Sequence, residues 1–453
     1  MCENRTNNVG QTTSMTPGSH RQCMTPLDPL RRRMMRLIML PVMLQVTSIA
    51  CGGSLGSEPL PDPRDPAATA RSTPLAIVGV RVVTMTSSTA LEDQTIVVRD
   101  GVIASIGPSS TAQLPADAVV IHGDNRYVMP ALIDMHAHLA SADLDAYLDA
   151  GIGTVRNMWG HAAIATMQRE IAAGTRSGPT IVSASPGVDA SPPQWPRTLL
   201  VTNAAQAREI VRAQAAAGWP YLKVYTRLSR EMFDSVMVAA RSVGIPALGH
   251  VPLDVGHAID EGMKSIEHLT GYGRAVSRTG RAGTWGWVDA DVSRFASLAE
   301  RSARAGVWNC PTLAIYTELA KQHSAAEREL IVRNRRQFVR ELSRAGGRIL
   351  LGTDAGIDVV APGTSIHEEL RELVASGLSP FDALRAGTTS AAEFLGLPDV
   401  GRVVVGARAD LLVLRGNPLV DVQQARRIDG IVTHGAWRRR RETGDGRRVA
   451  GDG

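Results

Sequence analysis

The sequence predicts an α/β fold: a (β/α)8 TIM barrel with a small β-sandwich-like domain built from its N- and C-terminal flanks. Three observations predict it. The chain has 453 residues, which exceeds the ~250 of a plain barrel and leaves room for one small extra domain. Residues 131–395 alternate β-like runs with helical stretches, as βα units around a parallel sheet do. Short β runs with turns precede this region at residues 75–130 and follow it at 396–436.

The composition fits a globular enzyme, with 44% hydrophobic and 21% charged residues. Aromatic residues make up only 4%, so the core must come mainly from Val, Leu, Ile and Ala. The net charge of +5 is small, and arginines cluster at residues 31–36 and 438–441. We expect a solvated basic tail at 437–453 and no nucleic-acid partner, because the rest of the chain is close to neutral.

The N-terminus has the layout of a secretory signal. After the basic cluster, the apolar run Leu37–Ala50 is too short for a membrane-spanning helix, which needs ~20 apolar residues. The residues around Cys51 resemble a bacterial lipobox, although Ser48 stands where that pattern favours Leu or Val. We therefore expect residues 1–50 to direct export to the bacterial cell envelope, with membrane contact only through a lipid on Cys51. The alternative is a disordered extension with a chance apolar patch.

Residues 51–74 are rich in Gly, Ser, Pro and Asp and predict a flexible tether. Beyond it, Arg99-Asp100-Gly101 separates two β runs and predicts a hairpin. We expect the later strands to complete the sheet begun by the earlier ones. The predicted strands of this domain are 76–84, 94–98, 102–106 and 118–121 before the barrel, and 401–405, 409–414 and 430–432 after it.

The barrel region contains eight predicted strands and several helices with apolar residues at helical spacing. Ser324 and Glu327 have the spacing of a capping box and predict a helix start. The helices expected from periodicity are 203–217, 230–243 and 324–345. The strands are the one leading to His136 and those at 154–158, 180–184, 221–225, 247–251, 265–269, 307–313 and 349–353.

Two histidines lie two positions apart at the end of an apolar run. Residues i and i+2 of a strand share a face, so His136 and His138 point to the same side. Neighbouring neutral imidazoles are typical of a metal site, although buried core histidines are the alternative for an isolated pair.

Four more ligand-type residues lie at or near the C-terminal ends of later strands: Lys223, His250, His268 and Asp354. Barrel active sites are built at that face. Each of these side chains is costly to bury alone, and a shared metal would satisfy all of them together. Asp354 also has the spacing of a helix N-cap, which is the structural alternative.

Taken in this order, these residues resemble the amidohydrolase superfamily over roughly residues 75–435. Within it, the sequence is similar to the branch of imidazolonepropionase-like and Xaa-Pro dipeptidase (prolidase-like) enzymes. The resemblance implies one or two divalent metals, usually zinc. It assigns His136, His138 and Asp354 to the first metal, His250 and His268 to the second, and a carbamylated Lys223 as the bridge between them. A simple ammonium at Lys223 is the alternative, as in single-metal relatives.

The resemblance also implies a mechanism. A metal-activated hydroxide attacks the scissile carbonyl, and Asp354 acts as general base and then general acid. Tyr225 lies two residues beyond Lys223 and is a candidate donor to the oxyanion.

The favoured substrate is a small molecule with an amide bond, a dipeptide or an N-acyl amino acid. A cyclic amide such as an imidazolone, a lactone or an organophosphate is the alternative on the same metal centre. A non-catalytic surface scaffold is more remote, and a homo-oligomer is one possible assembly.

The remaining polar residues receive simpler interpretations. His367 opens the last helix near the mouth and either caps it or contacts substrate. Glu267 precedes His268, so strand alternation predicts that it points to the helices. The loop Pro186–Arg197 either covers the site or is a rigid surface loop. Cys310 is interpreted as a buried apolar residue. Four histidines are interpreted as surface or packing residues: His161, His257, His323 and His434.

Overall fold

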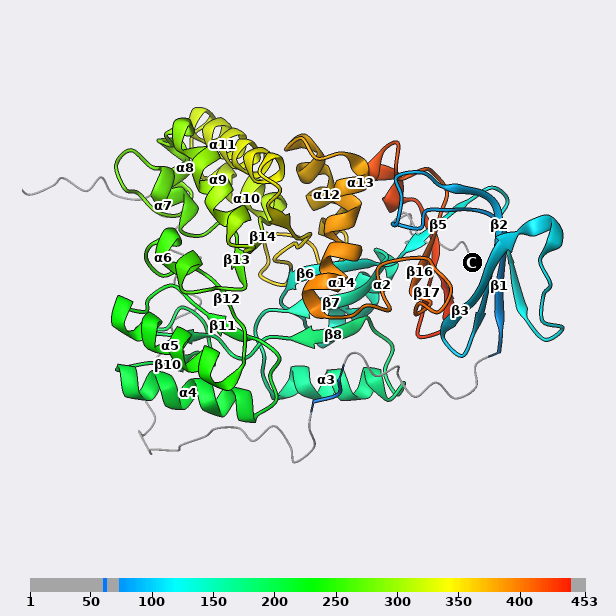
Figure 1. The fold of residues 1–453 in the computed structure, drawn as a ribbon, viewed down its shortest axis with the longest axis horizontal. Helices are drawn as coiled ribbons and strands as arrows, with labels where there is room; N and C mark the ends of the chain where they lie inside the picture. The colour runs from blue at the N-terminus through cyan, green and yellow to red at the C-terminus, as the bar shows by residue number, and fades with distance from the viewer. Residues whose placement is uncertain (1–59, 63–72, 441–453) are drawn as a thin grey trace, which may run out of the picture. The chain divides into compact units, whose positions relative to one another are not determined.

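The computed structural model describes residues 60–62 and 73–440 (Figure 1). The predicted signal segment 1–50, Cys51, most of the tether 51–74 and most of the tail 437–453 lie outside these residues, so the structure does not test them. Among the described residues, we find no helix with the length and apolar character needed to cross a bilayer.

Eight parallel strands form a closed barrel, so the (β/α)8 prediction is confirmed. Between β8 and β11, the Ser185 amide donates to the Tyr221 carbonyl at 2.8 Å. The ring closes where the Met135 amide donates to the Leu351 carbonyl at 2.8 Å, next to β15. The strands are β6 (Leu132–Ala137), β7 (Ile152–Asn157), β8 (Thr180–Ser183), β11 (Leu222–Val224), β12 (Ala247–Gly249), β13 (Ser265–Glu267), β14 (Trp308–Cys310) and β15 (Arg348–Ile349).

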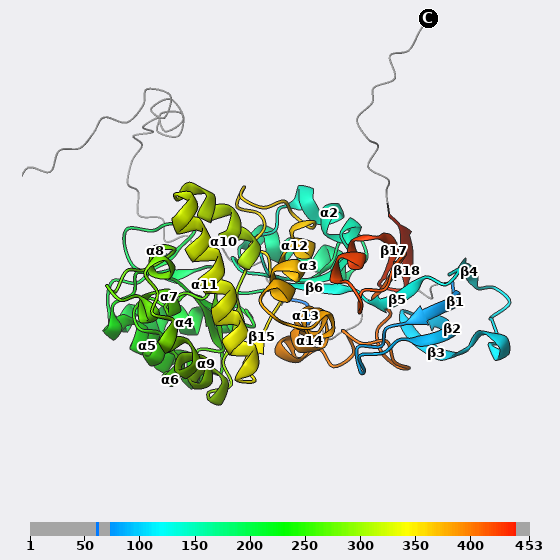
Figure 2. The same ribbon diagram turned by 90° about the horizontal axis from the view of Figure 1, so that it is seen from above.

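Helices surround the barrel, and α11 runs past α8, α9 and α10 (Figure 2). The predicted capping box is present: the Ser324 hydroxyl accepts from the Glu327 amide, and the Glu327 carboxylate accepts from the Ser324 amide. The helices are α2 (Leu144–Asp149), α3 (Ala162–Ala172), α4 (Ala204–Ala216), α5 (Arg230–Val243), α6 (Val255–Asp260), α7 (Tyr272–Val276), α8 (Trp285–Val288), α9 (Phe295–Arg304), α10 (Leu313–Leu319), α11 (Ala325–Arg344), α12 (Ser365–Ala375), α13 (Pro380–Ala386) and α14 (Thr389–Leu395).

The two flanks of the chain form one sheet, as predicted. Its order is β18-β17-β16-β5-β1-β2-β3, with β4 also paired to β1. Asp100 and Gly101 have φ of 48° and 74° in the predicted hairpin, the left-handed pair that a tight β-turn needs. The strands are β1 (Leu75–Val82), β2 (Leu91–Arg99), β3 (Val102–Pro108), β4 (Val119–His122), β5 (Tyr127–Pro130), β16 (Leu411–Leu414), β17 (Ile428–Thr433) and β18 (Ala436–Arg439).

Two boundary predictions for this domain were wrong. Residues 401–405 form no strand, because left-handed Gly401 and Gly406 bracket them and Val403 only packs against the sheet core. The basic tail does not begin at residue 437, because β18 pairs with β17 through Arg439. Arg438 bonds Asp145 at 2.7 Å and Asp149 at 3.0 Å, so it is held in the fold and is not part of a solvated tail.

Candidate metal centre and active site

The predicted ligands converge at the mouth of the barrel, from five different strand ends. His136 lies in β6 and Lys223 in β11, while His250 and His268 directly follow β12 and β13. His138 directly follows β6. Asp354 follows β15 and lies at the centre of the group. Its Oδ1 lies 3.2 Å from Nε2 of both His136 and His138, and its Oδ2 lies 3.8 Å from Nδ1 of His268.

Two imidazole pairs extend this group. The ring centroids of His136 and His268 are 4.3 Å apart, and those of His250 and His268 are 4.7 Å apart. His268 Nδ1 is hydrogen-bonded to the Thr312 hydroxyl at 2.8 Å, which leaves its Nε2 available to a ligand. The site therefore brings together the four histidines that the resemblance assigned to the metals: His136, His138, His250 and His268.

Two buried nitrogen atoms of this group lack a hydrogen-bond partner. They are Nε2 of His136 and Nζ of Lys223, whose residues are 0% and 1% exposed. An unsatisfied polar atom in the interior is costly, and native structures rarely leave one without a function. Nitrogen and carboxylate donors in this arrangement fit a divalent metal.

The backbone at the site is strained at three strand ends. His268, Thr312 and Asp354 have φ of 59°, 45° and 60°, the left-handed region that non-glycine residues rarely occupy. Such strain costs free energy and clusters at functional sites. The strained residues follow β13, β14 and β15, at the end of the barrel where the ligands meet.

The prediction that Glu267 points to the helices was wrong. Glu267 is fully buried inside the barrel, where its Oε2 accepts from His136 Nδ1 at 2.7 Å. Strand alternation requires an extended backbone, and the left-handed turn at His268 breaks it. Consecutive residues therefore both serve the same site.

Arg156 completes this support beneath the predicted metal ligands. Its Nη2 donates to both carboxylate oxygens of Glu267 at 2.9 Å, and its Nε donates to the Met135 carbonyl. His136 Nδ1 is held by Glu267, so its Nε2 faces Asp354. Sequence reasoning missed Arg156. A signal was present, since it is the charged residue within the otherwise buried run of β7.

The electrostatics of the site follow from burial and close charges. Burial lowers the pKa of Lys223 to about 8, although Glu267 and Asp354 raise it. Burial also holds the pKa of His250 and His268 well below the usual range. For Asp354, burial would raise the pKa, but the nearby His268 and His136 lower it far below its ordinary value. The arrangement favours neutral imidazoles, an ionised aspartate and a lysine that deprotonates readily.

A cavity of about 380 Å³, the mouth cavity, opens over these residues. Its aromatic lining includes Trp159, Trp195, Tyr225 and Tyr316. The Trp195 indole donates to the Tyr225 hydroxyl at 2.5 Å, so the loop Pro186–Arg197 packs over the site. This is the covering role that the sequence left open for the loop.

Two further histidines lie in places that the sequence did not indicate. His161, interpreted as a surface or packing residue, lines the mouth cavity. His367 is buried, bonds the Ala150 carbonyl through Nε2 at 3.0 Å and does not line the mouth cavity. It therefore bonds the carbonyl at the C-terminal end of α2, and the expected cap of its own helix, α12, is wrong. His257 and His323 bond Asp234 and Thr284, as expected of ordinary packing residues.

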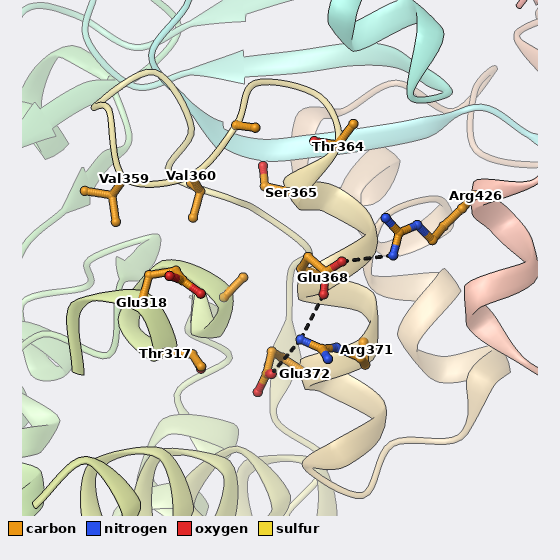
Figure 3. Close-up of a pocket in the computed structure, with 12 residues that line it drawn as sticks. Thr317, Glu318, Val359, Val360, Thr364, Ser365, Glu368, Arg371, Glu372 and Arg426 are labelled. Carbon is orange, nitrogen blue, oxygen red and sulfur yellow. Dashed lines mark hydrogen bonds and ion pairs between the residues drawn. The ribbon is translucent and has the colours of Figure 1, made fainter. Parts of the chain in front are cut away.

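A separate cleft of about 270 Å³ lies between α10 and α12 (Figure 3). None of the predicted site residues lines it. Its Glu368 carboxylate bonds Arg426 at 3.0 Å and Arg371 at 2.8 Å, so these charges are already paired. The cleft does not belong to the metal centre.

A barrel whose strand ends carry this set of histidines, lysine and aspartate defines a metal-dependent hydrolase. Residues 127–438 match the amidohydrolase family, and the chain belongs to that family. It is a hydrolase that acts on carbon–nitrogen bonds, of the imidazolonepropionase-like and prolidase-like branch.

Individual relatives agree with this placement. The chain is 28% identical to imidazolonepropionase of Mycolicibacterium smegmatis over 358 residues, which are 72% of this chain and 85% of that protein. It resembles the solved bottromycin amidohydrolase with a TM-score of 0.66 and 25% identity, over 86% of this chain and 92% of that one. A Xaa-Pro dipeptidase with bound methionine shares the fold with a TM-score of 0.66 and 20% identity, over 81% and 100% of the two chains.

Proposed function

We propose that this protein hydrolyses the amide bond of a dipeptide or an N-acyl amino acid at a centre of one or two zinc ions. The observation that carries the proposal is the buried cluster around Asp354, in which His136 Nε2 and Lys223 Nζ have no hydrogen-bond partner. A cation close to both nitrogens, or a group that reacts with the lysine, would satisfy them together.

In this proposal, His136, His138 and Asp354 would hold the first ion, and His250 and His268 would hold the second. A carbamylated Lys223 would supply a further carboxylate-type ligand. Carbamylation needs a neutral amine, and the lowered pKa of Lys223, about 8, provides a useful neutral fraction near pH 7.5. Histidine nitrogen and carboxylate oxygen are the ligands that zinc prefers.

Bound cations would lower the pKa of water towards neutrality and polarise the scissile carbonyl. The chain's own groups then move the protons. Asp354 is ionised, so it accepts the proton of the attacking water and returns it to the leaving nitrogen. Tyr225 accepts from Trp195, which leaves its own hydroxyl proton free to stabilise the oxyanion.

A second candidate is a cyclic amide of the imidazolone type. The 28% identity to an imidazolonepropionase favours it. Lactones and organophosphates are further alternatives, because the same metal centre activates water against any of these electrophiles.

The test combines metal analysis with a substrate screen. The purified chain is assayed for zinc per molecule and for hydrolysis of Xaa-Pro dipeptides, N-acyl amino acids, imidazolones, lactones and organophosphates. We expect one or two ions per chain, loss of hydrolysis with a chelator and recovery with zinc. Bound metal without turnover of any compound would favour a scaffold protein and contradict the proposal.

We also propose that the protein is exported and anchored through a lipid on Cys51. The sequence around Cys51 supports this proposal. Radiolabelled palmitate should enter the full-length chain and not the Cys51→Ala variant, and only the labelled chain should sediment with membranes. Equal soluble fractions of both chains would contradict the anchor.

A further inference from the structure

A second cavity of about 320 Å³ adjoins the mouth cavity. His250, His268 and Tyr316 line both cavities, so the predicted metal ligands form part of the wall between them. The second cavity extends from this wall past the chain that follows β12 and β13. A substrate bound across the ligands therefore has one space on each side.

The two spaces differ in charge. The second cavity is lined by Arg274 and Arg335 and by no carboxylate. The mouth cavity contains the carboxylate of Asp354 beside its aromatic side chains. The cleft of Figure 3 is different again, because glutamates pair with its arginines. Among these cavities, only the second combines two guanidinium groups with no negative side chain in its lining.

Neither arginine forms an ion pair within the described part of the chain. Arg274 is exposed and makes no hydrogen bond or ion pair with any residue that the structure describes. Arg335 is 2% exposed, and its Nε has no hydrogen-bond partner. Its Nη2 donates to the carbonyls of His268 at 2.9 Å and Pro311 at 3.1 Å. Its guanidinium carbon lies 3.7 Å from the centroid of the Tyr316 ring.

Guanidinium groups without an ion-pair partner in a partly enclosed space attract an anion, and their planar fork matches a carboxylate. We propose that the second cavity is the subsite for the substrate carboxylate. Arg274 binds that carboxylate directly, and Arg335 adds positive charge from behind. The aromatic mouth cavity takes the acyl side, with the scissile amide between them. This inference rests on the proposed amide hydrolysis and adds the orientation of the substrate.

Arg197 is the competing cation. It lines the mouth cavity from an exposed loop. It is the one arginine in that lining, whereas two arginines and no carboxylate line the second cavity, so the second cavity offers an anion two guanidinium groups. The structure therefore assigns the substrate anion to Arg274, and Arg197 provides a matched control.

The experiment compares N-benzoyl-L-alanine with N-benzoyl-L-alanine amide, which differ only in the carboxylate. The readout is the ratio of kcat/KM for the acid to that for the amide. Loss of a charge-assisted bond predicts that Arg274→Met lowers this ratio by about 10- to 100-fold, mainly through KM. Arg335→Lys keeps the charge and should lower the ratio less, while Arg197→Met should leave it unchanged. An unchanged ratio in Arg274→Met, or an equal fall in Arg197→Met, overturns the inference.

A binding measurement separates this inference from the proposed function. Calorimetry with the zinc-loaded chain gives the affinities of both compounds without requiring turnover. Since a carboxylate also binds zinc, the comparison is between the wild type and Arg274→Met. A preference for the acid that falls in Arg274→Met supports the subsite even if neither compound is hydrolysed, in which case only the proposed function fails. If the compounds are hydrolysed but the preference for the acid is the same in the wild type and in Arg274→Met, only the proposed subsite is wrong.

Discussion

Two regions of the molecule hold histidines and carboxylates close enough to share a metal, and they differ in one respect. In the outer cluster at α5 and α6, ligand atoms of Asp234, His257 and Glu261 lie within 4.8 Å of one another. There, His257 Nε2 lies 2.5 Å from Asp234, and Arg241 pairs with Glu261 at 3.0 Å. At the barrel mouth, His136 Nε2 and Lys223 Nζ are buried without hydrogen-bond partners.

The difference teaches that residue type and proximity do not define a metal site. The partly exposed outer cluster satisfies its own charges. The mouth cluster is buried, and its backbone is strained at His268 and Asp354. The strained backbone and the unpartnered nitrogens of His136 and Lys223 cost free energy, which a bound ligand would offset.

Asp354→Asn should produce the largest effect. The amide cannot act as a base and is a poorer metal ligand, so kcat should fall by about 100- to 10,000-fold. Steady-state kinetics at saturating zinc, with metal content measured in parallel, test it. Near-normal turnover in this variant would contradict the distinction between the two clusters, because the barrel mouth would then not be the reaction centre.

Glu267→Gln should weaken metal binding by about 10- to 100-fold, because a neutral amide supports the His136 imidazole less well. Competition with a chelator measures the affinity. The variant also leaves the buried Arg156 without its carboxylate partner. Thermal melting and the double variant Arg156→Met/Glu267→Gln therefore separate loss of stability from loss of affinity. Unchanged affinity in a folded Glu267→Gln chain contradicts the support role.

His367→Gln should change stability and not activity, because His367 caps α2 away from the mouth cavity. Loss of its buried hydrogen bond predicts about 1 kcal/mol less stability at pH 7. Burial lowers the folded-state pKa of His367 to about 3. The wild type should therefore lose stability as the pH falls from about 6.5 towards 3, because the unfolded histidine binds a proton in that range. The melting temperature should therefore depend less on pH in the variant than in the wild type. A fall in kcat/KM of the variant would instead show that His367 acts in the active site.

Asp234→Asn should have the smallest effect. The Asp234–His257 pair is partly exposed, and such pairs contribute about 0–1 kcal/mol. Zinc per chain and kcat should match the wild type. One equivalent of zinc lost from this variant, with activity retained, would show that the outer cluster also binds metal.

Much of the site could be predicted because it follows from local rules. The spacing of His136 and His138 on a strand, and the positions of Lys223 and His268 at later strand ends, place them at one barrel face once the βα alternation is recognised. The capping box at Ser324 is equally local. These features depend on periodicity and short spacings, so the sequence by itself determined the barrel and the set of residues that meet at its mouth.

Only the tertiary structure decided how those residues are supported and what surrounds them. Glu267 meets Arg156 across 111 positions, and the left-handed turn at His268 reverses the face that alternation assigned to Glu267. Loop packing brings Trp195 over the mouth, and helix packing brings Arg335 behind the second cavity. These contacts join parts of the chain that local spacing does not relate. They are fixed by packing and by the need to pair buried charges, which act only after the barrel has closed.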